Sequence, residues 1–230
     1  DLLLFLLNSV EDAPIVFLCI ARPVDNQAVP QIQRIGPTLP EARYSAIALE
    51  PLSLQDSAAL IDLLLTIADL PETLRQMIPQ RAEGNPFYLE EIVRSLIEQG
   101  AIARAGEHWQ ATQQLAIATI PGTLQALLLA RIDRLQEDVR RTLQLAAVIG
   151  RSFLFKLLES ISEAERELDW HLAQLEQADL VREKTRVPEL EYIFKHALTQ
   201  EAACDSLLLE QRREFHRQVG AALEQLFAER

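Results

Sequence analysis

The chain has 230 residues, of which 49% are hydrophobic, and it carries a formal net charge of −12 at pH 7. This length and composition are those of a globular, helix-rich protein with one large or two small domains. The negative charge argues against a general nucleic-acid or anionic-membrane binder. The two cysteines lie far apart, and the four histidines lack the spacing of metal ligands. We therefore expect a cytoplasmic protein without a disulfide framework or a metal site.

The first fifty residues are predicted to form part of an α/β core. A buried helix is expected over residues 1–9, whose apolar run is far shorter than the roughly 20 residues of a membrane span. Because the chain begins inside this helix, we expect it to be a fragment of a longer protein. The apolar segments 15–20 and 45–49 are predicted strands, the first buried on both faces as in a parallel sheet. Arg22 follows the first strand at the edge where ligands bind in open α/β sheets, and is either a phosphate-binding residue or an ordinary surface arginine.

A small bundle of helices with short polar connections is predicted next. The first helix is expected over residues 53–70, and the second begins at Pro71 and is interrupted by Pro79. After a third helix, a short hairpin is expected around Gly106. Residues 120–123 mark a domain boundary.

The third helix follows a sharp turn and is the most informative segment of the chain. Gly84 permits a left-handed backbone, Asn85 is a good N-cap, and Pro86 fits the first helical position. Gly100 is expected to end the helix. Its apolar stripe contains Phe87, Leu89, Ile92, Val93, Leu96 and Ile97. The charged residues outside this stripe are Glu90, Glu91, Arg94 and Glu98.

From residue 124 onward, helices are predicted on both sides of a β-hairpin, which is typical of a winged helix. Helices are expected over 124–135, 139–149, 153–161 and 162–177, strands over 180–183 and 190–194, and a last helix over 210–227. The fourth of these helices would be the DNA reader of a winged helix, but it is acidic and would repel phosphates. We therefore expect no DNA binding.

Two motifs resemble those of the STAND ATPases, a branch of the AAA+ P-loop ATPases found in large bacterial signalling regulators. A Gly-Asn-Pro-Phe turn leading into Leu-Glu-Glu-Ile-Val is similar to the lid segment of that family. A Phe-Lys-His-Ala-Leu sequence resembles its winged-helix histidine motif, in which aspartate stands in place of Ala197. With that aspartate replaced, Gln200 or Glu201 is the candidate cap of the helix. The resemblance implies the following cofactor-binding residues: Gly84 for the turn, Pro86 for the adenine end, Arg22 for the terminal phosphate and His196 for the diphosphate.

The resemblance implies a mostly α chain in three parts. Residues 1–52 would be the C-terminal end of an α/β P-loop core, residues 53–122 a helical lid with a short hairpin, and residues 123–230 a winged-helix domain leading to a C-terminal helix. The sequence contains no Gly-x-x-x-x-Gly-Lys-Ser/Thr loop, so the chain alone is expected to be inactive and to bind nucleotide weakly or not at all.

In the intact protein, the resemblance implies a nucleotide-dependent signal-transduction switch that binds ATP or ADP with magnesium. Its partners would be the upstream P-loop core and the output domains of the same chain, with self-assembly through the module and no membrane or DNA partner. A winged-helix transcriptional regulator and a non-catalytic helical interaction scaffold are the alternatives.

Overall fold

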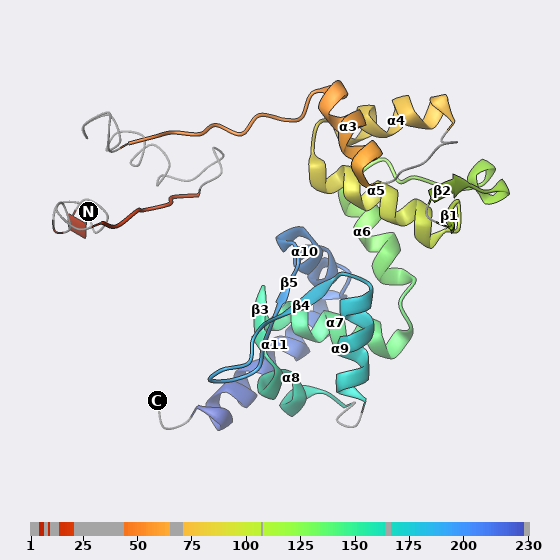
Figure 1. Cartoon of the computed structure of the whole chain (residues 1–230). Coiled ribbons are helices and arrows are strands. Elements are labelled where there is room, and N and C mark those ends of the chain that lie inside the picture. Colours follow the sequence, from red (N-terminus) through yellow and green to blue (C-terminus); the bar gives the residue numbers. More distant parts are fainter. Residues whose placement is uncertain are drawn as a thin grey trace. The chain divides into compact units, whose positions relative to one another are not determined.

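The computed structural model describes residues 5, 6, 9, 14–20, 44–64, 71–106, 108–163 and 167–227. The chain divides into two compact units, Asp1–Glu50 and Pro51–Arg230 (Figure 1). The described residues are mostly helical and contain small antiparallel sheets. None of the described helices combines the length and apolar character that a membrane span requires.

In the first unit, the two predicted strands do not form. Residues 14–20 and 44–50 carry no strand, and most of their apolar side chains are exposed, Val16 at 91% and Leu49 at 92%. A strand needs hydrogen-bonded neighbours and buried faces, and no partner strand pairs with either segment within the described part of the chain. The prediction of these two strands, the first of them buried, was therefore wrong. Residues 5, 6 and 9 are helical as predicted, although Phe5 and Leu6 are exposed rather than buried.

The second unit begins with helices packed around one apolar cluster. Its elements are α3 (Leu54–Leu64), α4 (Glu72–Ala82), α5 (Pro86–Glu98), β1 (Ile102–Ala105), β2 (His108–Ala111) and the 3-10 helix η3 (Gln113–Ala116). Ile61 of α3, Ile78 of α4 and Leu89 of α5 are buried together at the centre of this cluster. Contrary to the prediction, Pro79 lies inside α4 and does not interrupt it.

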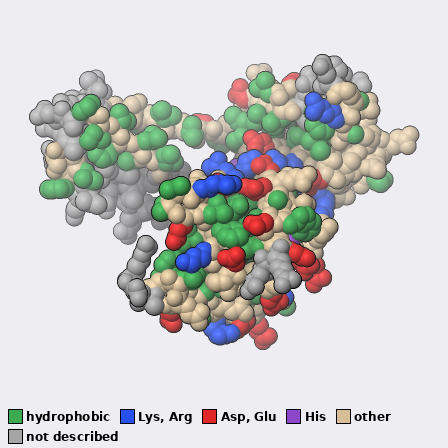
Figure 2. Space-filling model, turned by 60° about the horizontal axis from the view of Figure 1, so that its bottom comes forward, with side chains coloured by type: hydrophobic (Ala, Val, Ile, Leu, Met, Phe, Trp, Pro, Cys, Tyr) green, Lys and Arg blue, Asp and Glu red, His purple; other side chains and the backbone are tan. Residues whose placement is uncertain are grey.

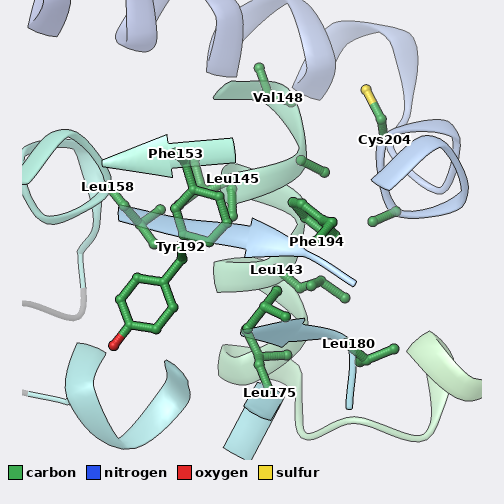
Figure 3. Close-up of a cluster of buried hydrophobic side chains, with 14 of the residues drawn as sticks. Leu143, Leu145, Val148, Phe153, Leu158, Leu175, Leu180, Tyr192, Phe194 and Cys204 are labelled. Atoms are coloured by element: carbon green, nitrogen blue, oxygen red, sulfur yellow. The ribbon is translucent and has the colours of Figure 1, made fainter. Parts of the chain in front are cut away.

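The remaining elements surround a second apolar cluster (Figure 3). They are α6 (Leu124–Asp133), α7 (Glu137–Ile149), β3 (Ser152–Leu154), α8 (Phe155–Ile161), α9 (Leu168–Gln177), β4 (Val181–Thr185), β5 (Glu191–Phe194), α10 (Ala197–Asp205) and α11 (Leu209–Leu226). The strands form an antiparallel sheet in the order β3-β5-β4, in which Phe153 lies opposite Tyr192 and Val181 opposite Phe194. The side chains of Phe153 and Phe194 are fully buried in the cluster.

The predicted hairpins and most of the predicted helices are confirmed in type. Gly106 makes the β1–β2 turn with a φ of +65°. Two helices start later than predicted. Residues 152–154 pair with β5 and form a strand before α8 begins. The helix predicted over 162–177 begins at Leu168, as α9. The predicted helix over 53–70 is confirmed to Leu64, and residues 65–70 lie outside the described part. The proposed domain boundaries stay predictions.

Candidate functional site

The Gly84 turn holds the start of α5 against the segment that precedes α3. Gly84 has a φ of +73°, and its carbonyl oxygen accepts a hydrogen bond of 2.8 Å from the N–H of Leu52. A Cβ atom at Gly84 would lie 2.5 Å from the carbonyl oxygen of Leu52 and 2.8 Å from its nitrogen. The close backbone approach and the left-handed conformation both call for glycine at this position.

The first turn of α5 is capped as the sequence predicts. The Asn85 side chain accepts hydrogen bonds from the N–H groups of Phe87 and Tyr88, at 3.0 and 3.3 Å. Pro86 occupies the first helical position and is exposed. The hydroxyl of Tyr88 donates a hydrogen bond of 3.0 Å to the carbonyl oxygen of Pro121, which ties the turn to the connection between α5 and α6.

The second motif meets this turn through an aromatic contact. His196 is the N-cap residue of α10 and is half-buried. Its ring stacks on the ring of Phe87, with a centroid distance of 3.7 Å and an interplanar angle of 28°. Because Phe87 directly follows Pro86, two of the predicted site residues lie in the same region of the unit.

The surroundings of His196 favour its neutral form. Burial lowers its pKa below the ordinary value of 6.5, and the positive charges of Lys195 and Arg94 act in the same direction against Glu90 and Asp179. A neutral imidazole can both donate and accept a hydrogen bond, and the first turn of α10 presents backbone N–H groups beside it. This is a suitable arrangement for a phosphate group.

The predicted cap of α10 by Gln200 is wrong. The Gln200 amide instead donates a hydrogen bond of 2.7 Å to the carbonyl oxygen of Ala147 in α7, and Glu201 is exposed. The side chain of His196 makes no cap hydrogen bond within the described structure. Gln200 therefore fastens α10 to α7 and leaves the N-terminus of α10 without that cap.

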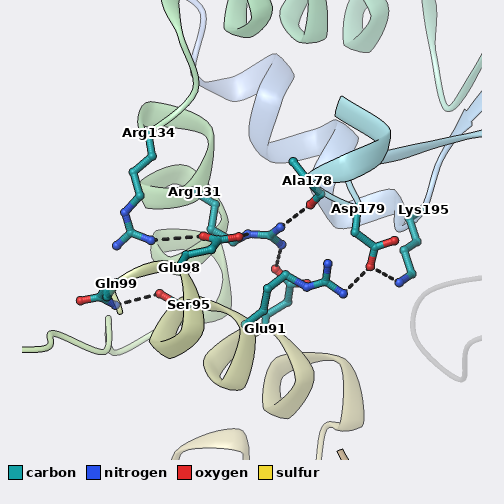
Figure 4. Close-up of polar contacts among 10 residues, drawn as sticks. Glu91, Ser95, Glu98, Gln99, Arg131, Arg134, Ala178, Asp179 and Lys195 are labelled. Carbon is teal, nitrogen blue, oxygen red and sulfur yellow. Dashed lines mark hydrogen bonds and ion pairs between the residues drawn. The ribbon is translucent and has the colours of Figure 1, made fainter. Parts of the chain in front are cut away.

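A network of charged side chains connects α5 with α6, with the turn after α9 and with the segment before α10 (Figure 4). In order of contact, this charged network consists of Lys195, Asp179, Arg94, Glu91, Arg131, Glu98 and Arg134. Arg131 is its centre, with a side chain only 3% exposed. It pairs with Glu91, pairs with Glu98 at 3.1 Å, and donates a hydrogen bond of 2.6 Å to the carbonyl oxygen of Ala178. One guanidinium thus links three helices.

Glu91 is buried, whereas the sequence pattern placed it outside the apolar stripe. Burial raises the pKa of Glu91, although the neighbouring Arg131 acts in the opposite direction. Glu91 and Glu98 are seven residues apart and share one face of α5, which faces Arg131. This spacing could have indicated an acidic face on the helix. The sequence does not show which distant cation lies opposite that face.

Asp179 links the charged network to the residue before His196. It occupies the position after the end of α9 with a φ of +58°, where glycine is the usual residue. The N–H of Leu180 donates a hydrogen bond of 3.0 Å to the carbonyl oxygen of Leu175, as in a Schellman motif. Burial alone would raise the pKa of Asp179, but the hydrogen bond from Lys195 and the charge of Arg94 outweigh it and lower that pKa.

Of the predicted site residues, His196 stacks on Phe87, the residue that follows Pro86, and Gly84 shapes the turn before them. Arg22 lies outside the described residues. Among those described, no group of three or more His, Cys, Asp or Glu side chains is arranged to hold a metal ion. Sequence reasoning missed the polar and aromatic contacts that join the two motifs, which involve Phe87, Arg94, Arg131, Asp179 and Lys195.

Part of the chain matches a known family model. A family model described as a domain of unknown function (DUF8739) matches residues 53–107, which include α3, α4, α5 and the Gly84 turn. No curated protein matches the chain. The chain is therefore similar to that domain over residues 53–107.

Proposed function

We propose that the chain is part of a nucleotide-dependent signal-transduction ATPase of the STAND type, which acts in the cytoplasm and controls an attached output domain. The observation that carries the proposal is the stack between Phe87 and His196, which lies next to Pro86. The base and the diphosphate of a nucleotide are joined through one ribose. A protein that contacts both must therefore bring the two contacts together, and the stack supports this because it joins His196 to the residue that follows Pro86.

In this proposal, each motif contributes one contact. Pro86, which is exposed, contacts the base, and the Gly84 turn sets its position. His196, whose surroundings favour its neutral form, hydrogen-bonds the diphosphate together with the N-terminal amides of α10. Arg22 would contact the terminal phosphate. The P-loop lysine and the magnesium ligands would belong to an upstream core, because this sequence contains no P-loop.

The remaining architecture is compatible with a lid followed by a winged helix. The elements α3–α5 with the β1–β2 hairpin correspond in order to the proposed lid, and α6–α11 with the β3-β5-β4 sheet to the proposed winged helix. Exchange of the bound nucleotide would change the arrangement of these parts relative to the upstream core. That change would be transmitted to the output domain.

DNA regulation is less well supported than nucleotide sensing. The exposed side of α9 carries Asp169 and Glu176, and Glu167 precedes it, so this helix would repel the phosphate backbone. Acidic and basic side chains are interspersed over the face in Figure 2, whereas DNA binding calls for a continuous basic surface. Retention of the chain on DNA at physiological salt would reverse this preference.

Calorimetric titration with ADP and ATP tests the proposal. We expect no tight binding by the 230-residue chain and clear binding by a longer protein that includes the upstream P-loop core. In the longer protein, Pro86→Ala and His196→Ala should each weaken binding. His216→Ala is the matched control, because His216 is exposed on α11. If the longer protein binds no nucleotide, a helical interaction scaffold becomes the better account.

A further inference from the structure

We propose that Asp179 is a positioning residue for His196, because its carboxylate joins Lys195, which directly precedes His196, to Arg94 of α5. The inference rests on the proposed function, which gives His196 its nucleotide-sensing role. Whether Asp179 positions His196 can be tested on the chain alone, without a bound ligand.

The ion pairs of Asp179 join the same two segments that the stack of Phe87 on His196 joins. On α5, Phe87 and Arg94 are seven residues apart and therefore lie on one face of the helix. On the other side, His196 directly follows Lys195. Phe87 stacks on His196, and Arg94 reaches Lys195 through the carboxylate of Asp179. The same two segments are thus held at two points two helical turns apart.

A backbone hydrogen bond adds to this connection. The N–H of Lys195 donates a hydrogen bond of 3.0 Å to the carbonyl oxygen of Leu180, the residue after Asp179. Asp179 and Lys195 are therefore connected through both side chain and backbone. A shift of Asp179 relative to α5 would move the start of α10, and with it the ring of His196.

The backbone of Asp179 lies in the left-handed region. Its φ of +58° is unfavourable for a residue with a Cβ atom, and glycine would relieve the strain. Glu83, with a φ of +50° at the end of α4, is the other non-glycine residue with positive φ in the described part of the chain. Glu83 is exposed, so it provides a matched backbone control.

The test compares Asp179→Gly with Glu83→Gly by NMR of the histidine ring protons in the ligand-free chain. The His196 signals are assigned with His196→Gln, and the stack is reported by the ring-current displacement that Phe87 causes. If Asp179 positions His196, Asp179→Gly will abolish this displacement. The pKa of His196 will then rise towards 6.5, because burial is the largest cause of its lowered value.

The opposite result follows if Asp179 serves only as a helix terminus. The stack would then persist, and the pKa of His196 would fall, because the anion Asp179 is lost while burial and the charges of Lys195, Arg94 and Glu90 remain. A fall in the pKa with an unchanged ring-current displacement overturns the proposal. Glu83→Gly should change neither signal in either case.

A second variant covers a failure of the glycine variant to fold. Asp179→Asn keeps the size of the side chain and a tolerance for the left-handed backbone, but it removes the charge. Asp179→Asn should also release His196 from the stack. A positioning role is contradicted if the stack persists in this variant or if both variants unfold. Because no nucleotide is present, these results are independent of the calorimetric test of the proposed function.

Discussion

Replacement of Arg131 by methionine is the sharpest test of how the charged network stabilises the fold. The variant removes a guanidinium whose side chain is 3% exposed and leaves Glu91, which is 5% exposed, without its main counter-charge. It also leaves the carbonyl oxygen of Ala178 without its donor. Breaking a buried pair in this way costs about 3–5 kcal/mol. This is a large part of the free energy of unfolding of a typical domain, which is about 5–15 kcal/mol.

The pH dependence of this loss has a defined sign. Burial raises the pKa of Glu91 above the usual 4.5 in the folded state, so stability falls as the pH rises through that folded pKa. Loss of Arg131 removes an interaction that opposes this increase and raises the pKa of Glu91 further. The destabilisation by Arg131→Met should therefore be largest at pH 7 and should shrink as the pH is lowered towards 4.5.

Urea unfolding monitored by circular dichroism at several pH values measures this effect. Arg217→Met is the control, because Arg217 pairs with Glu214 on the exposed side of α11 and its removal should leave the free energy of unfolding unchanged. Combining Arg131→Met with Glu91→Leu should recover most of the loss, since no buried charge remains unpaired. A stabilising role of Arg131 is refuted if Arg131→Met lowers the free energy of unfolding no more than Arg217→Met does, or if its effect grows in acid.

Two further variants test the turn and the stack. Gly84→Ala should destabilise the protein by more than Gly106→Ala. Both glycines have a positive φ, which costs a residue with a Cβ atom about 1–2 kcal/mol. Of the two positions, Gly84 is the one where a Cβ atom would also meet backbone atoms. Equal losses in urea unfolding would show that the close approach does not matter. Phe87→Ala should raise the pKa of His196 towards 6.5 in an NMR titration, because the stacked ring contributes to its burial. An unchanged pKa would mean that Phe87 does not bury His196.

Local chemistry was sufficient to predict the capped elements of the second unit. Asn85 and Pro86 identify the start of α5, and Gly106 identifies the β1–β2 turn, because each of these residues suits its position through its own backbone or side-chain geometry. The same reasoning failed at residues 15–20. An apolar run can form a buried strand only beside partner strands, and periodicity does not show whether they are present.

The charged network could not be predicted because its contacts are distant in sequence. Arg131 lies 40 residues beyond Glu91, and Arg94 lies 85 residues before Asp179. Asp179 also follows a helix that would ordinarily end in glycine, so its left-handed backbone has no local signal. By contrast, His196 was selected through a family resemblance, and its contact with Phe87 emerged only from the packing of α5 and α10.

The most direct test of the proposed switch is an ADP titration, monitored through the NMR signals of His196, of the longer protein that includes the upstream P-loop core. We predict that the His196 signals shift as ADP is added and stop shifting once ADP saturates the protein. The signals of the exposed His216 should not shift. Unchanged His196 signals at ADP concentrations that saturate the protein would contradict the central claim that His196 senses the diphosphate.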